Sequence, residues 1–360
     1  MKKIIISIAA AIVLLFAGKT KAQTNDVIYS VIYNSVYDNY PLPMIGFINV
    51  AHGNLNTFQL GFVNATQLHN SAAQIGFVNT TGSINGAQFG YINNSRRFVN
   101  GFQGGFVNAA GAEVNGFQAG FVNVSGQWLN GFQAGFVNAT RRTVDGFQAG
   151  YVNVAGENLD GAQFGFVNAT AKDVDGAQFG FVNVASKLNG LQLGFVNVVD
   201  SVVSGAPIGF LSIVRKGGYK AFGVYADEMF PINLSFRIGV KSFYTNFVLS
   251  HNNTFDNKFA LGAGVGAIID MNERLFLNPE FMSQSSINSS LLYQQNTLLN
   301  LSLGYKLTRN LHFAAGPSLV WSYSNDLNNV MEPYVSIYDF AMSGRNRMHI
   351  GARASMYVSF

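Results

Sequence analysis

The sequence predicts an all-β protein: a β-solenoid built from 15-residue repeats, followed by a small antiparallel β-barrel of about eight strands. A Gly-aromatic pair recurs with a period of 15 residues from Gly46 to Gly209. After Lys216, apolar and polar side chains alternate in segments of about ten residues. Neither region has the 3.6-residue apolar rhythm of a helix.

Residues 1–22 are expected to form a signal peptide. Two lysines precede an apolar run at residues 4–17, and Thr20 and Ala22 are small residues at the positions that a signal peptidase recognises. The apolar run is shorter than the roughly 20 residues of a transmembrane helix. We therefore expect an exported protein whose mature chain starts near Gln23.

The composition limits the class of protein. Only 11% of the residues are charged, and the chain holds 39 Gly, 32 Phe and no Cys, which excludes disulfides and the acylated cysteine of a lipoprotein. The net charge of +4 includes four lysines of the leader, so the mature chain is close to neutral. Basic residues come as scattered pairs, so no nucleic-acid partner is expected.

Residues 44–215 hold twelve copies of one unit, which begins with Gly-Phe-Val-Asn and ends with Asn-Gly or Asp-Gly, an aromatic or Ala, Gln and an apolar residue. Such a unit is extended, either as one coil of a parallel solenoid or as a strand with a hairpin turn. Near-identity of the units favours the solenoid, because coils about 4.8 Å apart place equal side chains over one another. The coils predict a rod of roughly 55 Å, with residues 23–43 as its N-terminal cap.

Stacking of the coils predicts two structural ladders of amide side chains. Each amide can hydrogen-bond to its copy one coil away and so be buried without an unpaired polar group. The first ladder comprises Asn64, Asn79, Asn93, Asn108, Asn123, Asn138, Asn153, Asn168 and Asn183, with Asn49 and Asn197 at its ends. The second comprises Gln103, Gln118, Gln133, Gln148, Gln163 and Gln178, with Gln59, Gln74, Gln88 and Gln192 in the same column. A ligand-binding amide stripe is the alternative interpretation.

The residues on either side of each Gln exchange size. Phe117 is paired with Ala119, whereas Ala162 is paired with Phe164. Because positions two apart on a strand share a face, this exchange predicts a buried face of fixed volume.

Residues 216–360 have the pattern of an outer-membrane β-barrel, with an apolar face toward lipid and a polar face toward the lumen. Clear alternation occurs at residues 232–241, 299–307 and 348–360, and further strands are expected at 219–227, 259–269, 275–282 and 311–323. These are seven strands, so an even number requires residues 207–214 as the first. A soluble antiparallel sandwich or barrel that packs on the solenoid is the alternative.

The connections between these strands alternate in length. Tight turns are expected at residues 271–273 and 308–310, and long polar loops at 251–257, 283–296 and 324–346. This asymmetry is typical of the periplasmic and outer ends of a membrane barrel. Phe360 resembles the terminal aromatic residue of outer-membrane barrels.

Charged residues at lumen-facing positions are expected to form a buried salt-bridge network, because an eight-stranded barrel has room only for side chains. They are Arg237, Lys241, Glu280, Lys306 and Arg353.

The repeat resembles that of a bacterial exported surface-repeat family whose tandem units read Gly-Phe-Gln-x-Gly-Phe-Val-Asn, as at residues 116–123 and 146–153. The resemblance covers residues 44–212, and residues 207–219 and 275–280 also resemble the C-terminal region of these proteins from Gram-negative bacteria. It implies a surface or outer-membrane protein of unknown biochemical role. Some members are lipoproteins, but this chain has no lipobox cysteine, so its anchor is expected in the C-terminal region.

No enzyme is expected from the sequence. The five histidines have no metal-ligand spacing, no cysteine nucleophile exists, and Asp145, Asp160 and Asp175 occupy a turn position that other units fill with Asn. No catalytic residue, cofactor or metal is therefore predicted. We expect a cell-envelope protein at the outer membrane or cell surface with a structural or interaction role. The alternative is a secreted or periplasmic adhesin that binds glycan or protein and has a soluble C-terminal domain.

Overall fold

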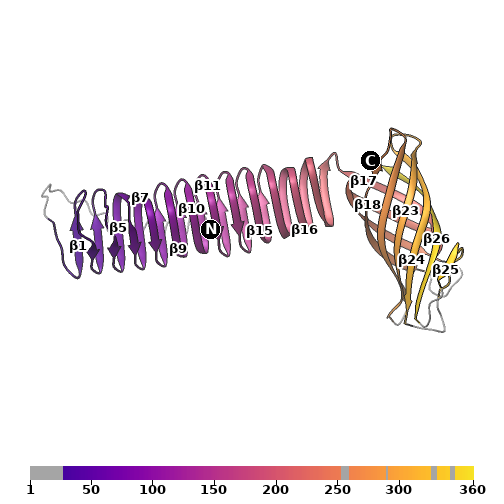
Figure 1. Cartoon of the computed structure of the whole chain (residues 1–360), viewed down its shortest axis with the longest axis horizontal. Helices are drawn as coiled ribbons and strands as arrows, with labels where there is room; N and C mark the ends of the chain where they lie inside the picture. Colours follow the sequence, from indigo (N-terminus) through magenta and orange to yellow (C-terminus); the bar gives the residue numbers. More distant parts are fainter. Residues whose placement is uncertain (1–26, 253–258, 289–290, 326–330, 341–344) are drawn as a thin grey trace.

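The computed structural model describes residues 27–252, 259–288, 291–325, 331–340 and 345–360, so the predicted signal peptide lies outside it. A straight rod of stacked coils leads into a β-barrel (Figure 1). The fold confirms the predicted class: a parallel β-solenoid followed by a closed antiparallel barrel of eight strands. In the described part of the chain, no helix is long and apolar enough to cross a membrane.

The strands of the rod are β1 (Tyr33–Val36), β2 (Met44–Ile45), β3 (Ile48–Ala51), β4 (Gln59–Leu60), β5 (Val63–Asn70), β6 (Ala73–Ile75), β7 (Val78–Phe89), β8 (Ile92–Ser95), β9 (Val99–Ala110), β10 (Val114–Ser125), β11 (Leu129–Ala134), β12 (Val137–Thr140), β13 (Val144–Ala149), β14 (Val152–Ala155), β15 (Leu159–Thr170) and β16 (Asp173–Lys216). Those of the barrel region are β17 (Tyr219–Ala226), β18 (Ile232–Val240), β19 (Phe243–His251), β20 (Phe259–Gly266), β21 (Ile269–Asp270), β22 (Leu275–Asn288), β23 (Leu291–Lys306), β24 (Leu311–Ser324), β25 (Tyr338–Phe340) and β26 (Asn346–Ser359).

Neighbouring coils of the solenoid pair in parallel and in register. Asn115 lies beside Asn130 and Gln118 beside Gln133, so each residue meets its own copy. The antiparallel hairpin alternative is therefore excluded. One coil has two strand segments, β11 and β12 for example, which pair with β13 and β14 of the next coil. The rod is thus two stacks of strands joined by a corner at each side.

The Asn-Gly signal marks a bend within the strand and not a hairpin turn. Gly131 lies inside β11 with a φ of 140°, a region that residues with a side chain rarely adopt. A Cβ atom there would lie 2.1 Å from the carbonyl oxygen of Gly116 in the preceding coil. The bend therefore requires glycine both for its backbone angle and for the close approach of the coils.

The rod begins before the first predicted unit. Strand β1 lies in the segment expected to be a cap, and it pairs in parallel with β3, so that Asn34 stands beside Asn49. The repeat pattern misses this coil because it carries no Gly-Phe-Val-Asn phrase.

The barrel closes because β17 pairs with both β18 and β26. The predicted first strand at residues 207–214 is wrong, since those residues belong to β16 of the solenoid. The strand that completes the count is β19, which the sequence pattern missed. Its alternation is hidden because Tyr244 and Val248 are apolar residues that face inward, where they pack in the lumen.

The long polar loop expected at residues 283–296 is also wrong. Strand β22 continues to Asn288 and β23 starts at Leu291. Gln284 and Asn296 are fully buried in this extension. Its inward residues are polar because they face the lumen, and its outward residues Ser283 and Gln295 are polar as well and hydrogen-bond to each other at 3.2 Å. The expected loop at 251–257 lies largely outside the described residues.

Candidate functional site

The solenoid interior holds the Asn ladder. Asn123 donates to Oδ1 of Asn138 at 2.8 Å and accepts from Nδ2 of Asn108 at 2.8 Å. Its Nδ2 also donates to the carbonyl oxygen of Ala134 at 2.8 Å. Such side-chain bonds run without a break from Asn34 to Asn197.

The Gln column forms a second buried ladder of opposite direction. Gln118 donates to Oε1 of Gln103 at 2.6 Å, toward the N-terminal coil, whereas the Asn amides donate toward the C-terminal coil. An aliphatic column that includes Val114 and Leu129 is buried with the amides. Because the amides of both ladders are fully buried, they hold the coils together and present no amide stripe at the surface.

The Phe/small pairs lie outside, which corrects the buried face expected from them. Phe147 is 48% exposed and Phe164 is 44% exposed. Since Gln points inward, the residues before and after it must point outward. Rings of neighbouring coils meet on this outer surface where the order is kept, as Phe164 stacks on Phe179 with centroids 5.0 Å apart, and at one exchange of order, where the centroids of Phe89 and Phe102 are 5.3 Å apart.

One corner of the rod is a continuous aromatic edge. In each coil the aromatic residue after Gly marks the corner where the two segments meet: Phe136 lies between β11 and β12, and Phe121 lies inside β10 at the position where the pairing with β9 is interrupted. Neighbouring rings are nearly parallel, and Phe121 and Phe136 have centroids 4.9 Å apart at an interplanar angle of 1°. Each ring is still 42–55% exposed. The aromatic edge comprises Phe47, Phe62, Phe77, Tyr91, Phe106, Phe121, Phe136, Tyr151, Phe166, Phe181, Phe195 and Phe210.

The opposite corner is a charged edge. It lies between the second strand segment of one coil and the first segment of the next, as residues 141–143 lie between β12 and β13. Exposed ion pairs link its coils, among them Lys172 with Glu157 at 3.5 Å. The charged edge comprises Arg96, Arg97, Glu113, Arg141, Arg142, Glu157, Lys172, Asp173, Lys187, Asp200 and Arg215.

An exposed column of aspartates lies beside the charged edge. Asp160 stands in register between Asp145 and Asp175. Partial burial raises the pKa of Asp160, and the charges of Asp175 and Asp145 raise it further. Among the described residues, no group of three or more potential ligands gathers closely enough to hold a metal ion.

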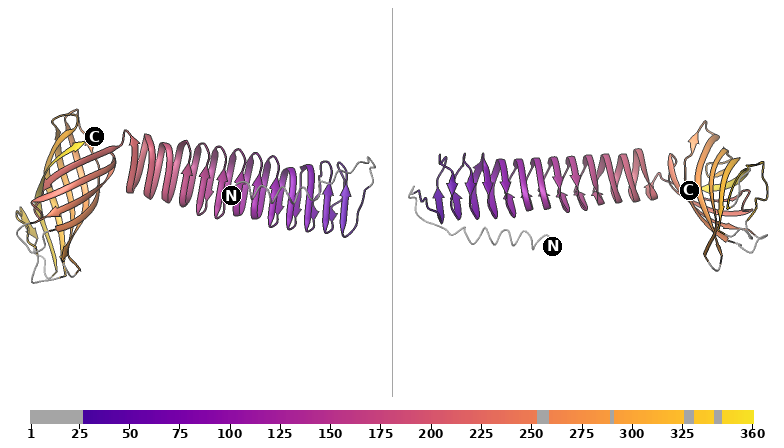
Figure 2. Two further views of the ribbon diagram at one scale, coloured as in Figure 1. Left: turned by 180° about the vertical axis from the view of Figure 1, so that it is seen from behind. Right: turned by 60° about the horizontal axis from the view of Figure 1, so that its bottom comes forward.

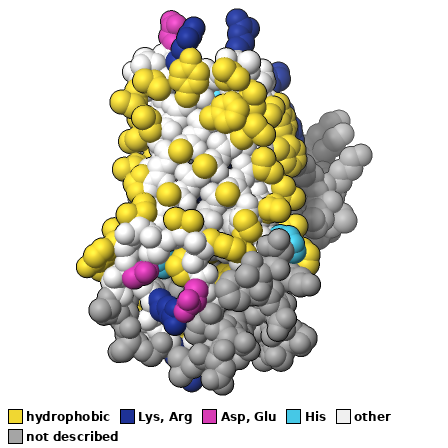
Figure 3. Space-filling view, turned by 90° about the vertical axis from the view of Figure 1, so that its right-hand side faces the viewer, with side chains coloured by type: hydrophobic (Ala, Val, Ile, Leu, Met, Phe, Trp, Pro, Cys, Tyr) yellow, Lys and Arg dark blue, Asp and Glu magenta, His cyan; other side chains and the backbone are white. Residues whose placement is uncertain are grey.

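The outer wall of the barrel is apolar. Outward residues such as Leu261 and Leu301 are 56% and 48% exposed, and the alternate residues face the lumen. Figure 3 shows this wall, with charged side chains gathered above and below a wide zone that carries none. The apolar surface is thus a band around the barrel, and polar groups lie at its two ends.

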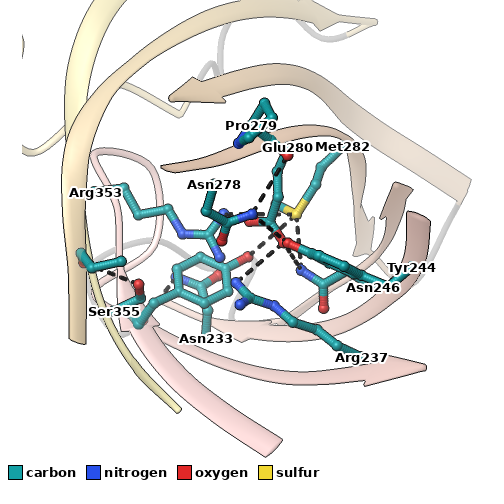
Figure 4. Close-up of polar contacts among 12 residues, drawn as sticks. Asn233, Arg237, Tyr244, Asn246, Asn278, Pro279, Glu280, Met282, Arg353 and Ser355 are labelled. Carbon is teal, nitrogen blue, oxygen red and sulfur yellow. Dashed lines mark hydrogen bonds and ion pairs between the residues drawn. The ribbon is translucent and has the colours of Figure 1, made fainter. Parts of the chain in front are cut away.

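Three of the predicted lumen residues form one buried cluster (Figure 4). Glu280 is paired with Nη2 of Arg237 at 3.1 Å and with Nη1 of Arg353 at 2.6 Å. Tyr244 donates to the same carboxylate at 2.8 Å. The guanidinium of Arg353 also lies 3.6 Å from the ring centroid of Tyr225. This part of the lumen is therefore filled with paired side chains.

Lys241 and Lys306 lie apart from that cluster, which corrects their expected place in the buried network. Both bind Asp270 at the rim that carries the short turns, at 3.1 Å and 2.8 Å. Lys241 is 57% exposed. Lys306 is the last residue of β23 and Lys241 directly follows the end of β18, so both continue the alternation to a point where the lumen opens to solvent.

The end of the solenoid rests on the outer wall of the barrel. Thr245 donates to the carbonyl oxygen of Gly209 at 3.0 Å, and the rings of Phe210 and Phe247 meet edge-on. Ile238 and Val240 of the wall are buried, although other outward residues are exposed. From this junction the rod extends sideways from the barrel (Figure 2).

Sequence reasoning missed the aromatic edge and the junction. The sequence does carry a signal for the aromatic edge, because residues 117–124 and the equivalent stretches of all the remaining units contain no charged residue. A buried core also lacks charged residues, so composition alone does not distinguish a buried core from an exposed aromatic edge.

Comparison with known proteins gives one structural likeness. No family model matches the chain, and no curated protein matches it in sequence. The resemblance to the surface-repeat family therefore stays a prediction. A crystal structure of neisserial surface protein A matches 40% of this chain and 94% of its own, at 11% identity and a TM-score of 0.22.

Proposed function

We propose that this protein is a non-enzymatic component of the cell envelope, held in the outer membrane by its barrel and carrying the solenoid as a structural or interaction rod. The observation that carries the proposal is the closed barrel with an apolar outer band and an interior that holds buried polar and charged side chains beside two apolar clusters. Strand β24 has outward apolar residues from Leu311 to Trp321, ten positions further along the strand. At about 3.3 Å per residue and a tilt of about 40°, this span is about 25 Å, the height of the band in outer-membrane barrels.

The exposed wall favours a membrane barrel over a soluble one. The solenoid end covers only the wall around Ile238, Val240 and Thr245. Leu261, Leu301 and the rest of the band stay exposed. A soluble protein rarely leaves so large an apolar surface uncovered.

The connections favour a periplasmic solenoid. With eight strands, β17 begins and β26 ends at the same rim, where residues 241–242 and 307–310 form short turns. At the other rim, residues 227–231 join β17 to β18 and residues 325–345 join β24 to β26, whereas β22 and β23 are only two residues apart. Short turns face the periplasm in outer-membrane barrels, and the solenoid joins β17 at the short-turn rim.

The lumen supports a non-enzymatic role. Glu280, the carboxylate best enclosed for acid-base chemistry, is 3% exposed and neutralised by two arginines. Its partners fill the surrounding lumen, so a substrate has no access to it.

Fractionation of the native host tests the proposal. We expect the protein in the outer-membrane fraction, with a folded form that migrates faster on a gel than the boiled form. Recovery in the soluble periplasm without such a shift would contradict the membrane barrel and favour the soluble adhesin. A glycan array on the full-length protein addresses the interaction role.

A further inference from the structure

We propose that the aromatic edge of the solenoid docks on a lipid surface, the periplasmic leaflet of the membrane that holds the barrel. The proposal rests on the proposed function and adds a partner for the rod. Twelve stacked rings form an unbroken apolar ridge, each ring 42–55% exposed. A ridge of this length exceeds the apolar patch that a soluble protein ordinarily leaves in water.

Charge is divided between the two corners of the rod. Every Lys, Arg, Asp and Glu of residues 44–216 lies three, four, five or seven positions after the repeated Asn column, which Ser212 occupies in the last unit. The eight-residue stretch around the aromatic edge, such as residues 117–124, has none in any unit. The rod therefore has a charged edge and an apolar edge along its whole length, as an amphipathic helix at a membrane surface does.

The junction orients these two edges relative to the barrel. Phe210, the last ring of the aromatic edge, lies on Phe247, which is in the middle of β19 and faces outward. Thr245, two residues nearer the short-turn rim, contacts Gly209. The aromatic edge is thus level with the apolar band of the wall.

The other side of the same coil lies at the rim. Arg215 of the charged edge and Lys216 lead directly into β17 at the rim. Residues 202–205, which follow the charged edge in the last coil, share a hollow with Lys241 and Asn310 at the short turns. The charged edge is therefore level with the water-facing rim, and the aromatic edge faces the lipid side.

The composition of the ridge fits the interface between lipid headgroups and acyl chains. Tyr91 and Tyr151 replace Phe within the stack, and both are more than 45% exposed. Tyr is enriched where one end of the ring is apolar and the other reaches water. The rod is straight and extends sideways from the barrel (Figure 2), so the ridge continues along the membrane surface from Phe210.

The two native tryptophans make the test possible in the full-length protein. Trp128 lies beside the charged edge, where Arg142 covers its ring, and Trp321 is 55% exposed on the barrel wall. Three single-Trp proteins are compared: W321F retains Trp128, W128F retains Trp321, and W128F/W321F/F136W carries one Trp in the aromatic edge. Y151W in the same double background is the second edge probe, should F136W fail to fold.

Each protein is reconstituted in vesicles of phosphatidylethanolamine and phosphatidylglycerol with and without brominated acyl chains. We expect the brominated lipid to quench the edge Trp and Trp321 to a similar extent and to leave Trp128 unchanged. Equal emission of the edge Trp in both vesicles, with Trp321 quenched, would overturn the docking proposal while leaving the barrel in the membrane. The docking proposal would also be overturned if the edge Trp were not quenched and the aromatic edge could be cross-linked to a second copy of the chain. An unquenched Trp321 would instead remove the membrane barrel, and the docking proposal with it.

Discussion

The ring of Phe210 at the end of the solenoid meets the ring of Phe247 on the barrel wall edge-on, with 5.3 Å between the centroids and 77° between the planes. This contact holds the rod against the barrel close to Gly217 and Gly218, the two residues that connect β16 to β17. It also joins the aromatic edge to the apolar band, so that the two surfaces are continuous.

Loss of this contact should loosen the connection between rod and barrel. An aromatic pair contributes about 1 kcal/mol beyond the area it buries, so Phe247→Ala should raise the rate of tryptic cleavage after Lys216 about fivefold. The control is Leu249→Ala, which removes an exposed side chain from the same strand away from the rod. Equal cleavage rates in the two variants would show that Phe210 and Phe247 do not hold the junction.

The Asn ladder should contribute strongly to the stability of the solenoid. Asn123→Ala removes one of the two acceptors of the Asn108 amide, and it takes the donor from the buried Oδ1 of Asn138 and from the carbonyl oxygen of Ala134. We expect a loss of about 3 kcal/mol in the free energy of unfolding, measured by chemical denaturation of the full chain. Asn115→Ala, in the same coil but exposed, should change it by less than about 0.5 kcal/mol. A similar loss in both variants would contradict the ladder.

The aspartate column should make solenoid stability depend weakly on pH. Burial and the charges of Asp175 and Asp145 raise the pKa of Asp160, so the folded state holds this proton more tightly than the unfolded chain. The corresponding stability is fully present below the unfolded pKa of about 3.9 and is lost as pH rises through the raised pKa. Asp160→Asn should therefore raise stability slightly at neutral pH and low salt, with little effect at high salt.

Asp173→Asn is the control for this pH effect. Asp173 pairs with Lys187 at 3.7 Å, so its loss should not raise stability. An Asp160→Asn variant that is less stable than the native protein at neutral pH would contradict the repulsion.

The buried cluster should stabilise the barrel through Glu280. Glu280→Gln retains a side chain of similar size but leaves Arg237 and Arg353 buried without a counter-charge. Breaking such a pair costs about 3–5 kcal/mol, so the temperature at which the folded gel band disappears should fall. Glu273→Gln, exposed in a short turn, should leave that temperature unchanged. No difference between the variants would mean that the arginines do not depend on this carboxylate.

The sequence predicts the repeated parts of the fold because each coil of the solenoid imposes the same constraint. The in-register columns of Asn123 and Gln118 follow from period and amide chemistry alone. Period and amide chemistry do not reveal which side chains face outward. In the structure Phe117 and Phe121 point outward, whereas the polar Gln118 and Asn123 point inward. The two amide columns and the aromatic edge therefore depart from the usual rule that polar side chains face water, whereas the buried aliphatic column and the charged edge follow it.

In the barrel, prediction depends on how regular each strand is. Strand β26 alternates throughout, whereas Tyr244 and Val248 interrupt the polar residues on the inward face of β19. Lys306 has the lumen-facing parity of its strand, but it lies at the rim and pairs with Asp270. The alternation of side chains does not show where along a strand the lumen ends. Contacts between distant segments, such as Phe210 with Phe247, leave no trace in the local pattern.

The most direct test of the membrane barrel with a periplasmic solenoid is cysteine labelling of intact cells. The chain has no native Cys, so Val335→Cys at the long-connection rim, Glu273→Cys in a short turn and Lys172→Cys on the charged edge each provide one reactive site. A maleimide that cannot cross the outer membrane should label Val335→Cys on intact cells, and the other two only after the outer membrane is permeabilised. Labelling of Lys172→Cys on intact cells would contradict the periplasmic solenoid, and labelling of all three only after permeabilisation would contradict the membrane-spanning barrel.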